Sequence, residues 1–346
     1  MFAKPFLNIP WPVAERRSIV PVFLPFRGCP VRCVFCAQDA ATGRRAEAAI
    51  PSLLAALRAA LEQRAGEGKT PAELAFFGGT FTALPPEELE ACLSFATASK
   101  ACGLISGFRC STRPDSVSRP VLDMLLEAGC STVELGVQSF ADNSLQCCAR
   151  GYGRAEALDG CAAVKDAGLR LGVQLLPGLP EGTPETFLDD VRLALALGAD
   201  MLRFYPCLVL AGTALADIWR RGGYRPWDMA TTLDALARGW LLSRAAGTPV
   251  IRMGLAPEPA LTASVLDGPA HPALGSRVMG KALFLAVREM LDSHGLKSAA
   301  QLEAPMRTRG CFWGHAGELR SQWLSLGLDG KNVVFSPARE VRIWPP

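Results

Sequence analysis

Short runs of β-branched and aromatic residues alternate with longer amphipathic segments from about residue 20 to residue 254. The short runs predict seven strands, at Val22–Phe26, Leu74–Phe77, Phe108–Ser111, Thr132–Val137, Leu171–Leu176, Met201–Tyr205 and Val250–Met253. Strands that alternate with helix-length segments indicate βα units and a parallel sheet. Six or seven such units suit a barrel, or a partly open barrel, better than a sandwich.

The segments between the predicted strands repeat their apolar residues at the spacing of one helix face. In the first of them this face consists of Ile50, Leu53, Leu54, Leu57 and Leu61, and Pro51 is tolerated in the first turn. Further helices are predicted at Pro86–Ser99, Arg119–Glu127, Arg154–Asp166 and Pro184–Leu195. In such folds the loops at the C-terminal ends of the strands carry the chemistry, so polar residues there are site candidates.

The alternation stops near Gly254, and the following stretch, 256–273, is rich in proline and lacks clear periodicity. We therefore predict an N-terminal extension (1–20), a barrel (21–254) and a small α+β extension (255–346) that covers the barrel mouth. The last part contains one apolar helix candidate, Val278–Leu291, and a short terminal pattern, VVF followed by VRIW.

Composition and charge narrow the class of protein. Hydrophobic residues make up 49% and charged residues 20% of the chain, close to the globular average. A net charge of +3 is too small to indicate nucleic acid or a membrane surface as a partner. The N-terminus carries prolines and charges where a signal peptide needs an apolar run, so we expect a cytoplasmic protein. Asp200 and Arg203 interrupt the most apolar region, Leu193–Leu215, so no membrane span is expected.

Twelve cysteines are too few for a secreted disulfide scaffold, and we expect reduced thiols. Cys29, Cys33 and Cys36 form a tight CxxxCxxC in the loop after the first predicted strand. This is metal-ligand spacing, because a curled loop can point all three sulfurs at one centre. No fourth cysteine lies nearby, so one position on zinc or on an iron–sulfur cluster would stay open for a small molecule. Three buried cysteines without a metal are the alternative.

This trio resembles the signature of radical SAM enzymes. The resemblance implies a partial (β/α)6-type barrel in which Cys29, Cys33 and Cys36 hold a 4Fe–4S cluster. It also implies that S-adenosylmethionine (SAM) binds the fourth iron through its amino and carboxylate groups. In that family the reduced cluster cleaves SAM to methionine and a 5′-deoxyadenosyl radical, and the protein binds, orients and shields the cofactors.

The second predicted strand ends in Gly78, Gly79 and Thr80. Paired glycines let the backbone approach a ligand closely and expose its amide and carbonyl groups. The pair resembles the glycine motif that receives the methionine amino group in radical SAM enzymes. A plain βα turn is the alternative reading of the two glycines alone.

Polar side chains also follow the later strands. Gln138 and Arg150 keep the spacing of two SAM contacts in the oxygen-independent coproporphyrinogen dehydrogenase branch, and Gln174 occupies a third position, where that branch commonly has Asp. Ser111 stands where that branch usually has Glu. Arg203 and Tyr205, at the end of the sixth strand, are expected to reach SAM or the substrate.

Several motifs in the same order, from Ile19 to about Trp227, are similar to the radical SAM domain of the Elongator catalytic subunit and its short bacterial relatives. They include RGCPVRCVFC, FFGGTFT, STRPD, VELGVQSF and LPGLPEGTPE. Only about 90 residues follow the predicted barrel, and no acetyl-CoA pyrophosphate loop is visible. Acetyl transfer is therefore not expected.

These resemblances imply an enzyme that removes a hydrogen atom from a substrate, with a reductase such as flavodoxin or ferredoxin as electron donor. A tRNA nucleoside is the leading substrate, and a small metabolite or a tetrapyrrole is the alternative. A non-catalytic carrier of haem or an iron–sulfur cluster is the second hypothesis, and a zinc-stabilised protein is the third. His271 and His315 are candidates to line the barrel mouth as a proton donor or substrate contact, and exposed loop histidines without such a role are the alternative.

Overall fold

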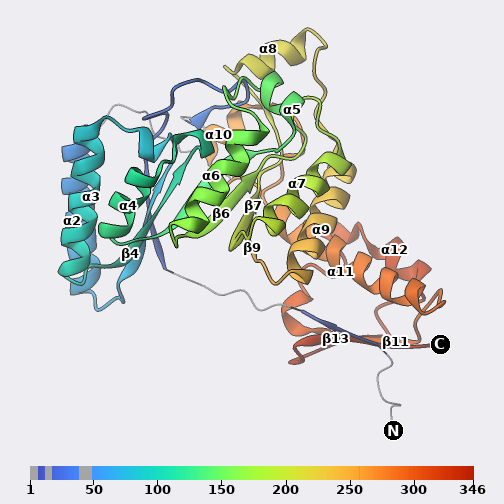
Figure 1. The fold of residues 1–346 in the computed structure, drawn as a ribbon. Coiled ribbons are helices and arrows are strands. Elements are labelled where there is room, and N and C mark those ends of the chain that lie inside the picture. Colours follow the sequence, from blue (N-terminus) through green and yellow to red (C-terminus); the bar gives the residue numbers. More distant parts are fainter. Residues whose placement is uncertain (1–6, 12–17, 39–48, 257) are drawn as a thin grey trace.

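A curled sheet of seven parallel strands forms the main body of the computed structural model, which describes residues 7–11, 18–38, 49–256 and 258–346 (Figure 1). The strands, in their order across the sheet, are β2 (Ile19–Phe23), β3 (Ala72–Phe77), β4 (Ile105–Thr112), β5 (Cys130–Gln138), β6 (Arg170–Leu175), β7 (Met201–Phe204) and β9 (Val250–Met253). Every neighbouring pair is parallel. Strands β2 and β9 form the two edges, so the sheet is a partial barrel.

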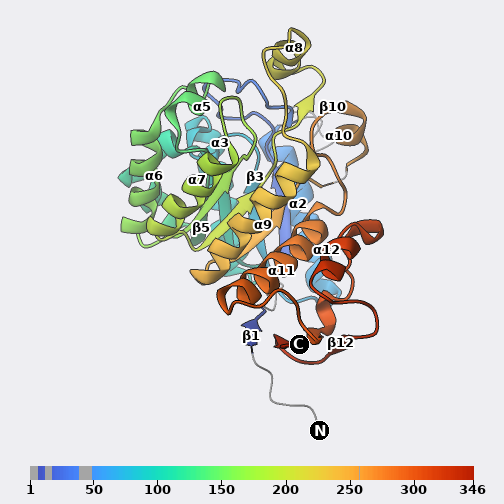
Figure 2. The ribbon, with the colours of Figure 1, turned by 90° about the vertical axis from the view of Figure 1, so that its right-hand side faces the viewer.

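The helices that connect these strands lie along the outer face of the sheet (Figures 1 and 2). They are α2 (Ile50–Gly66), α3 (Pro86–Ala101), α4 (Arg119–Glu127), α5 (Asp142–Cys147), α6 (Arg154–Asp166), α7 (Pro184–Ala196) and α9 (Met229–Ala245). Helix α8 (Ala214–Arg220) lies at the upper end of the molecule in Figure 1, beyond the sheet. The predicted α/β class and all seven predicted strands are confirmed. The first strand starts and ends three residues earlier than predicted, because the chain leaves the sheet at Leu24 and turns at Phe26, whose φ is +59°.

Alternation along the strands divides the sheet into an apolar and a polar face. On β3 and β4 the fully buried Leu74, Phe76 and Phe108 pack toward the helices. Phe76 stacks on Phe81 with ring centroids 4.7 Å apart, and it meets Phe108 edge-on at 5.9 Å. Side chains alternate between the two faces of a strand, so the intervening residues point to the inside of the barrel. The inner face therefore carries charged and polar groups, and the site is built on it.

The remainder of the chain adds three small structures. Strand β10 (Val265–Asp267) pairs with β8 (Val209–Leu210), and α10 (Pro259–Ser264) precedes it, so the stretch without predicted periodicity contains two short elements. Helix α11 (Leu274–Ser293) packs on α9, and α12 (Arg320–Ser325) follows it in the chain (Figure 2). A four-stranded sheet has the order β1 (Leu7–Pro10), β13 (Glu340–Trp344), β11 (Gln301–Pro305) and β12 (Val333–Ser336). The predicted α+β character of the extension is confirmed.

The first part of the extension lies at the mouth of the barrel, where Leu261 and Val265 pack near Leu208 and Leu210. Leu255 and Ala256 line the pocket at the mouth. The four-stranded sheet lies at the opposite end of the molecule from α8 and α10 (Figure 1). Within the described ranges, no helix has the length and apolar character needed to cross a bilayer.

Candidate functional site

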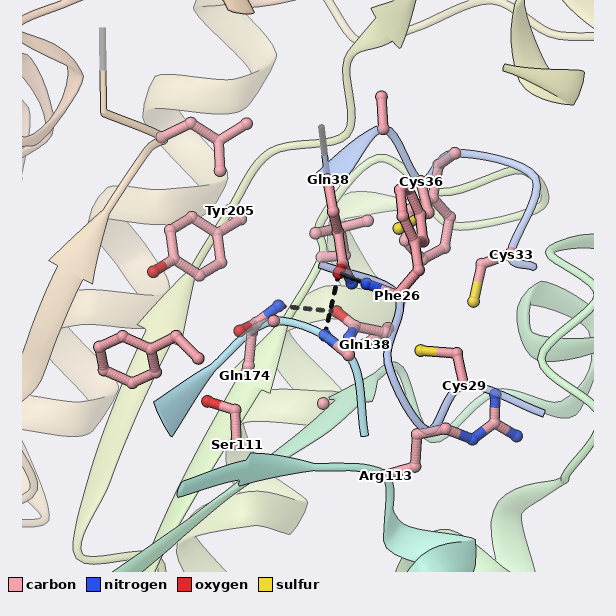
Figure 3. Close-up of a pocket in the computed structure, with 18 of the residues that line it drawn as sticks. Phe26, Cys29, Cys33, Cys36, Gln38, Ser111, Arg113, Gln138, Gln174 and Tyr205 are labelled. Carbon is pink, nitrogen blue, oxygen red and sulfur yellow. Dashed lines mark hydrogen bonds between the residues drawn. The ribbon is translucent and has the colours of Figure 1, made fainter. Parts of the chain in front are cut away.

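A pocket of about 440 Å³ opens at the C-terminal ends of the strands. It brings together every residue that the sequence assigned to the cluster or to SAM (Figure 3). These residues are Cys29, Cys33, Cys36, Gly78, Gly79, Thr80, Ser111, Gln138, Arg150, Gln174 and Arg203. Tyr205 also lines the pocket. The convergence follows from the parallel sheet, in which the carboxyl ends of all strands meet at one edge.

The cysteine loop runs from Leu24 to Gln38 and is curled by successive tight turns. Its backbone amides at Arg27, Cys29 and Cys36 each donate to a carbonyl three residues earlier, at 3.1 to 3.2 Å. Gly28 has a φ of +71°, and a Cβ there would lie 2.3 Å from the Thr80 carbonyl oxygen. The loop thus needs a glycine at this position to pack on the turn that follows β3.

The three thiols of this loop occupy one side of the pocket (Figure 3). The Cys29 sulfur lies 3.3 Å from Thr80 Oγ1, and the Cys33 sulfur accepts a hydrogen bond from Arg150 Nη1 at 2.9 Å. Burial, helped by the nearby Cys33 and Cys29 and opposed by Arg150, raises the pKa of Cys36 to about 12. Three neighbouring thiols are a donor set suited to a cationic iron centre.

The three sulfurs do not converge on the position of a single ion. In the part of the chain that the structure describes, no three His, Cys, Asp or Glu side chains gather closely enough to share one ion. A 4Fe–4S cluster takes one thiolate at each iron, so its ligand sulfurs stand further apart.

Gln38 joins the cysteine loop to the glycine turn, a role that the sequence alone did not predict. Its Oε1 accepts hydrogen bonds from the backbone amides of Phe26, at 2.6 Å, and Gly79, at 2.9 Å (Figure 3). One side chain therefore fixes both segments that border the thiols. The only signal in the sequence was a polar residue two positions after the last cysteine of the motif.

The two glycines after β3 are required by their backbone geometry. Gly78 and Gly79 have φ angles of +80° and +62°, in the region that favours glycine. A Cβ on Gly79 would lie 2.2 Å from the Arg27 carbonyl oxygen and 2.7 Å from that of Leu24. The Thr80 amide donates to the same Arg27 oxygen at 2.7 Å. The turn thus packs backbone to backbone against the cysteine loop.

The ends of β5 and β6 place two amide side chains at the centre of the pocket. Gln174 Nε2 lies 3.5 Å from Gln138 Oε1 (Figure 3). Gln138 is buried and has a φ of +70°, and the ladder between β5 and β6 shifts register beside it. A residue other than glycine in this region carries strain, and such strain clusters at functional sites.

Arg150 is held by a set of neutral oxygen acceptors. Its Nη2 donates to the Gly136 carbonyl at 2.6 Å and to the Tyr152 hydroxyl at 2.8 Å. The Tyr152 hydroxyl itself donates to the Gly136 carbonyl at 2.9 Å. Burial raises the pKa of Tyr152 to about 12, so its hydroxyl is neutral at physiological pH. Tyr152 therefore does not offset the positive charge that Arg150 holds beside the Cys33 sulfur. Tyr152 is a second residue that the sequence alone did not single out.

A buried ion network lies on the inner face of the barrel below the pocket. Arg109 pairs with Glu73 and, at 3.1 Å, with Glu134. Glu134 also pairs with Arg203 Nε at 2.6 Å, and Arg203 Nη1 donates to the Tyr205 hydroxyl at 3.0 Å. Glu73 and Arg109 were missed, although charged residues inside apolar strand runs are a signal for a paired interior.

Two candidate histidines lie outside the pocket. His271 and His315 pack against each other with ring centroids 4.6 Å apart, and neither is among the described residues that line the pocket. They belong to the segments that precede α11 and α12. Burial, followed by Arg277 and His315, lowers the pKa of His271.

Two family profiles match this chain. Residues 23–194 match the Radical SAM superfamily, and residues 199–281 match the Radical_SAM C-terminal domain. The chain belongs to the radical SAM superfamily. Enzymes of this superfamily use a 4Fe–4S cluster and SAM, and the three-thiol donor set fits that cofactor pair. Membership in this superfamily favours the hypothesis of a radical SAM enzyme over those of a non-catalytic carrier and a zinc-stabilised protein.

Curated relatives resemble part of the chain. The tRNA uridine(34) acetyltransferase of Methanocaldococcus infernus is 29% identical over 202 residues, which are 52% of this chain and 38% of the relative. Elongator complex protein 3 of Mus musculus is 29% identical over 194 residues, 50% of this chain and 35% of the relative. The chain thus spans less than two fifths of the length of these relatives.

A solved structure supports the fold. The archaeal Methanocaldococcus infernus Elp3 with an N-terminal deletion superposes with a TM-score of 0.56 at 22% identity. The match covers 81% of this chain and 63% of that one. At this identity the likeness concerns the arrangement of strands and helices.

Proposed function

We propose that Cys29, Cys33 and Cys36 hold the 4Fe–4S cluster of this enzyme and that SAM binds in the adjoining pocket. The observation that carries this proposal is the meeting of three free thiols with the glycine turn and the polar strand ends in one cavity. When bound, the cofactor pair supplies a 5′-deoxyadenosyl radical that removes a hydrogen atom from the substrate. A reductase such as flavodoxin or ferredoxin is the proposed electron donor.

The residues of the chain bind and orient this pair. Arg150 donates a hydrogen bond to the Cys33 sulfur and holds its positive charge against that sulfur. The exposed backbone of Gly78 and Gly79 receives the amino end of SAM, and Thr80 orients Cys29. The polar side chains at the strand ends contact the remainder of SAM, namely Ser111, Gln138, Gln174 and Arg203.

Apolar side chains shield the reacting centre from water. Aromatic rings from β2, the cysteine loop and β3 line the pocket together with leucines after β6 and β7. They are Phe23, Phe26, Phe35, Phe77, Leu176 and Leu208. A wall of this kind excludes water from a reactive intermediate.

A tRNA nucleoside is the proposed substrate, supported by relatives named for tRNA uridine(34) and Elongator. Only part of each relative matches this chain, and acetyl transfer is not part of the proposal. The test incubates the reconstituted enzyme with bulk tRNA, SAM and dithionite without oxygen. A changed nucleoside in the tRNA digest supports the assignment. 5′-Deoxyadenosine without any changed nucleoside favours a small metabolite or a tetrapyrrole.

Cysteine variants test the cluster assignment. After anaerobic reconstitution, wild type is expected to bind about four irons per chain. Cys29→Ala, Cys33→Ala and Cys36→Ala are expected to retain less iron and to form no 5′-deoxyadenosine from SAM and dithionite. Cys102→Ala is the control, because Cys102 is exposed and does not line the pocket. Full iron and undiminished cleavage in Cys33→Ala would contradict the proposal.

A further inference from the structure

The pocket carries positive charge in excess of what its cofactors need. Five arginines are among its described lining residues, namely Arg32, Arg113, Arg150, Arg203 and Arg252, and those lining residues include no aspartate or glutamate. Three of the five already have a side-chain partner. Arg113 pairs with Asp115 at 2.7 Å, Arg203 pairs with Glu134 at 2.6 Å, and Arg150 contacts the Cys33 sulfur. The other two are Arg32 and Arg252. Arg32 stacks on Phe26 within the cysteine loop, whereas Arg252 lies on strand β9.

Arg252 lies directly beside Arg203 on the neighbouring strand. The two are register partners in the parallel pair of β7 and β9, and both side chains line the pocket. Like charges side by side on adjacent strands destabilise a sheet. The Glu134 carboxylate is already shared between Arg203 and Arg109. Arg252 Nε donates to the Gly254 carbonyl at 3.1 Å, and no carboxylate in the described ranges pairs with its guanidinium.

SAM does not account for this charge. Its only anionic group is the carboxylate, and in radical SAM enzymes that group binds the open iron beside the cysteines. Tyr205 lies on the side of the pocket opposite Cys29 and Cys33 (Figure 3). The Tyr205 hydroxyl accepts from Arg203, so the arginine pair of β7 and β9 belongs to this opposite side. A ligand other than SAM is therefore needed to supply an anion there.

We propose that Arg252, together with Arg203 and the Tyr205 hydroxyl, binds an oxyanion of the substrate, either a phosphate or a carboxylate. The proposal rests on the proposed function, because it places SAM between the cysteines and this group. A guanidinium presents paired N–H donors that match the oxygens of both anions. Arg252 is exposed at the edge strand β9, so a substrate can reach it from solvent. Bound in this way, the substrate would be fixed across SAM from the cluster.

Binding of simple probes to the reconstituted enzyme with SAM tests this assignment. The probes are the four ribonucleoside 5′-monophosphates with their nucleosides, and glutarate with its neutral diamide, measured by calorimetry without oxygen. At least one charged probe is expected to bind about tenfold more tightly than its neutral counterpart. Preference for a nucleotide identifies a phosphate, and preference for glutarate identifies a carboxylate. The preference should decrease with added salt.

Variants decide whether Arg252 is responsible. Arg252→Gln is expected to abolish the preference for the charged probe, and Arg252→Lys is expected to retain part of it. Arg221→Gln is the control, because Arg221 is exposed and outside the pocket. Equal binding of charged and neutral probes to wild type, or an unchanged preference in Arg252→Gln, would overturn the inference. 5′-Deoxyadenosine is measured in the same samples, so loss of SAM cleavage in wild type would point to failure of the proposed function instead.

Discussion

Arg150 donates a hydrogen bond to the sulfur of Cys33 at 2.9 Å, although 117 positions separate the two residues in the sequence. The guanidinium reaches this sulfur because Gly136 and Tyr152 fix its other nitrogens. A fixed positive charge beside one thiol acts on its neighbours too. Arg150 lowers the pKa of Cys36, against the larger effects of burial and of the other two thiols.

This relationship predicts how cluster assembly depends on pH. In the iron-free protein the pKa of Cys36 is about 12, so its thiol is protonated at neutral pH and must lose a proton to bind iron. Below that pKa the thiolate fraction grows about tenfold per pH unit. We expect assembly, followed by the sulfur-to-iron absorbance band, to accelerate between about pH 7 and about pH 9. Arg150→Met removes a group that lowers this pKa, so its profile should shift to higher pH. An unchanged profile would show that Arg150 does not act on the thiols, and the exposed Arg192→Met is the control.

Gly79→Ala should damage the site through backbone contact. The new Cβ would meet the Arg27 and Leu24 carbonyl oxygens and would also occupy a left-handed conformation. Gly68→Ala is a matched control, because Gly68 has a φ of +69° and a Cβ there would meet no other atom within 4 Å. We expect a loss of unfolding free energy of about 1 kcal/mol for Gly68→Ala, and a clearly larger loss for Gly79→Ala. Denaturant unfolding and SAM titration measure both. Equal losses would show that the contact with the cysteine loop is not tight.

Glu134→Gln should destabilise the barrel, because Glu134 is buried and neutralises two arginines at once. Loss of one partner from a buried ion pair costs about 3 to 5 kcal/mol. The exposed pair of Arg119 and Asp123, at 2.8 Å, is the control, and Asp123→Asn should cost at most about 1 kcal/mol. Denaturant unfolding of the two variants tests the difference. A small effect of Glu134→Gln would mean that Arg109 and Arg203 find other partners.

Asp190 should make stability depend on pH. Burial raises its pKa to about 6 from 3.8, although the Phe140 amide and the Ser139 hydroxyl donate to it and oppose the rise. The folded carboxyl therefore holds its proton more tightly than the unfolded one. Its contribution is complete below about pH 4 and is lost as the pH rises through about 6, by up to about 3 kcal/mol.

Asp190→Asn lacks this titration, so its unfolding free energy should gain on that of wild type between about pH 4 and about pH 7. Asp217→Asn, at an exposed position that does not act on Asp190, should follow wild type. Denaturant unfolding at several pH values measures the three proteins. Parallel pH profiles for wild type and Asp190→Asn would contradict the shift.

Much of the fold was accessible from local pattern. The helices at Arg119–Glu127 and Arg154–Asp166 begin and end where they were predicted. In each, an apolar face indicates the helix and turn residues mark its ends. The pairing of β1 with β13 could not be predicted, because it joins segments at opposite ends of the sequence. Strand β10 was missed for a similar reason, since its partner β8 lies more than fifty residues earlier in the chain.

For the site, too, local features could be predicted from the sequence, and contacts between distant segments could not. Cysteine spacing and strand-end position placed all the predicted cluster and SAM residues in the pocket, because both are properties of neighbouring residues in a parallel sheet. Gln38 was missed, because its role consists of hydrogen bonds to two backbone amides that only the folded loop brings together. The contact between His271 and His315 was not predicted, because it joins two segments that lie far apart in the sequence.

The antiparallel pairing of β1 with β13 joins the two ends of the described chain by strand hydrogen bonds. Leu7 and Ile9 are buried in that sheet, and the buried Trp11 packs on Trp240 of α9 with ring centroids 4.9 Å apart. Removal of either terminal segment would thus leave the other without its strand partner. Loss of Trp11 would also expose α9 around Trp240. Protein prepared for crystallisation should keep both termini, and affinity tags should be attached through spacers.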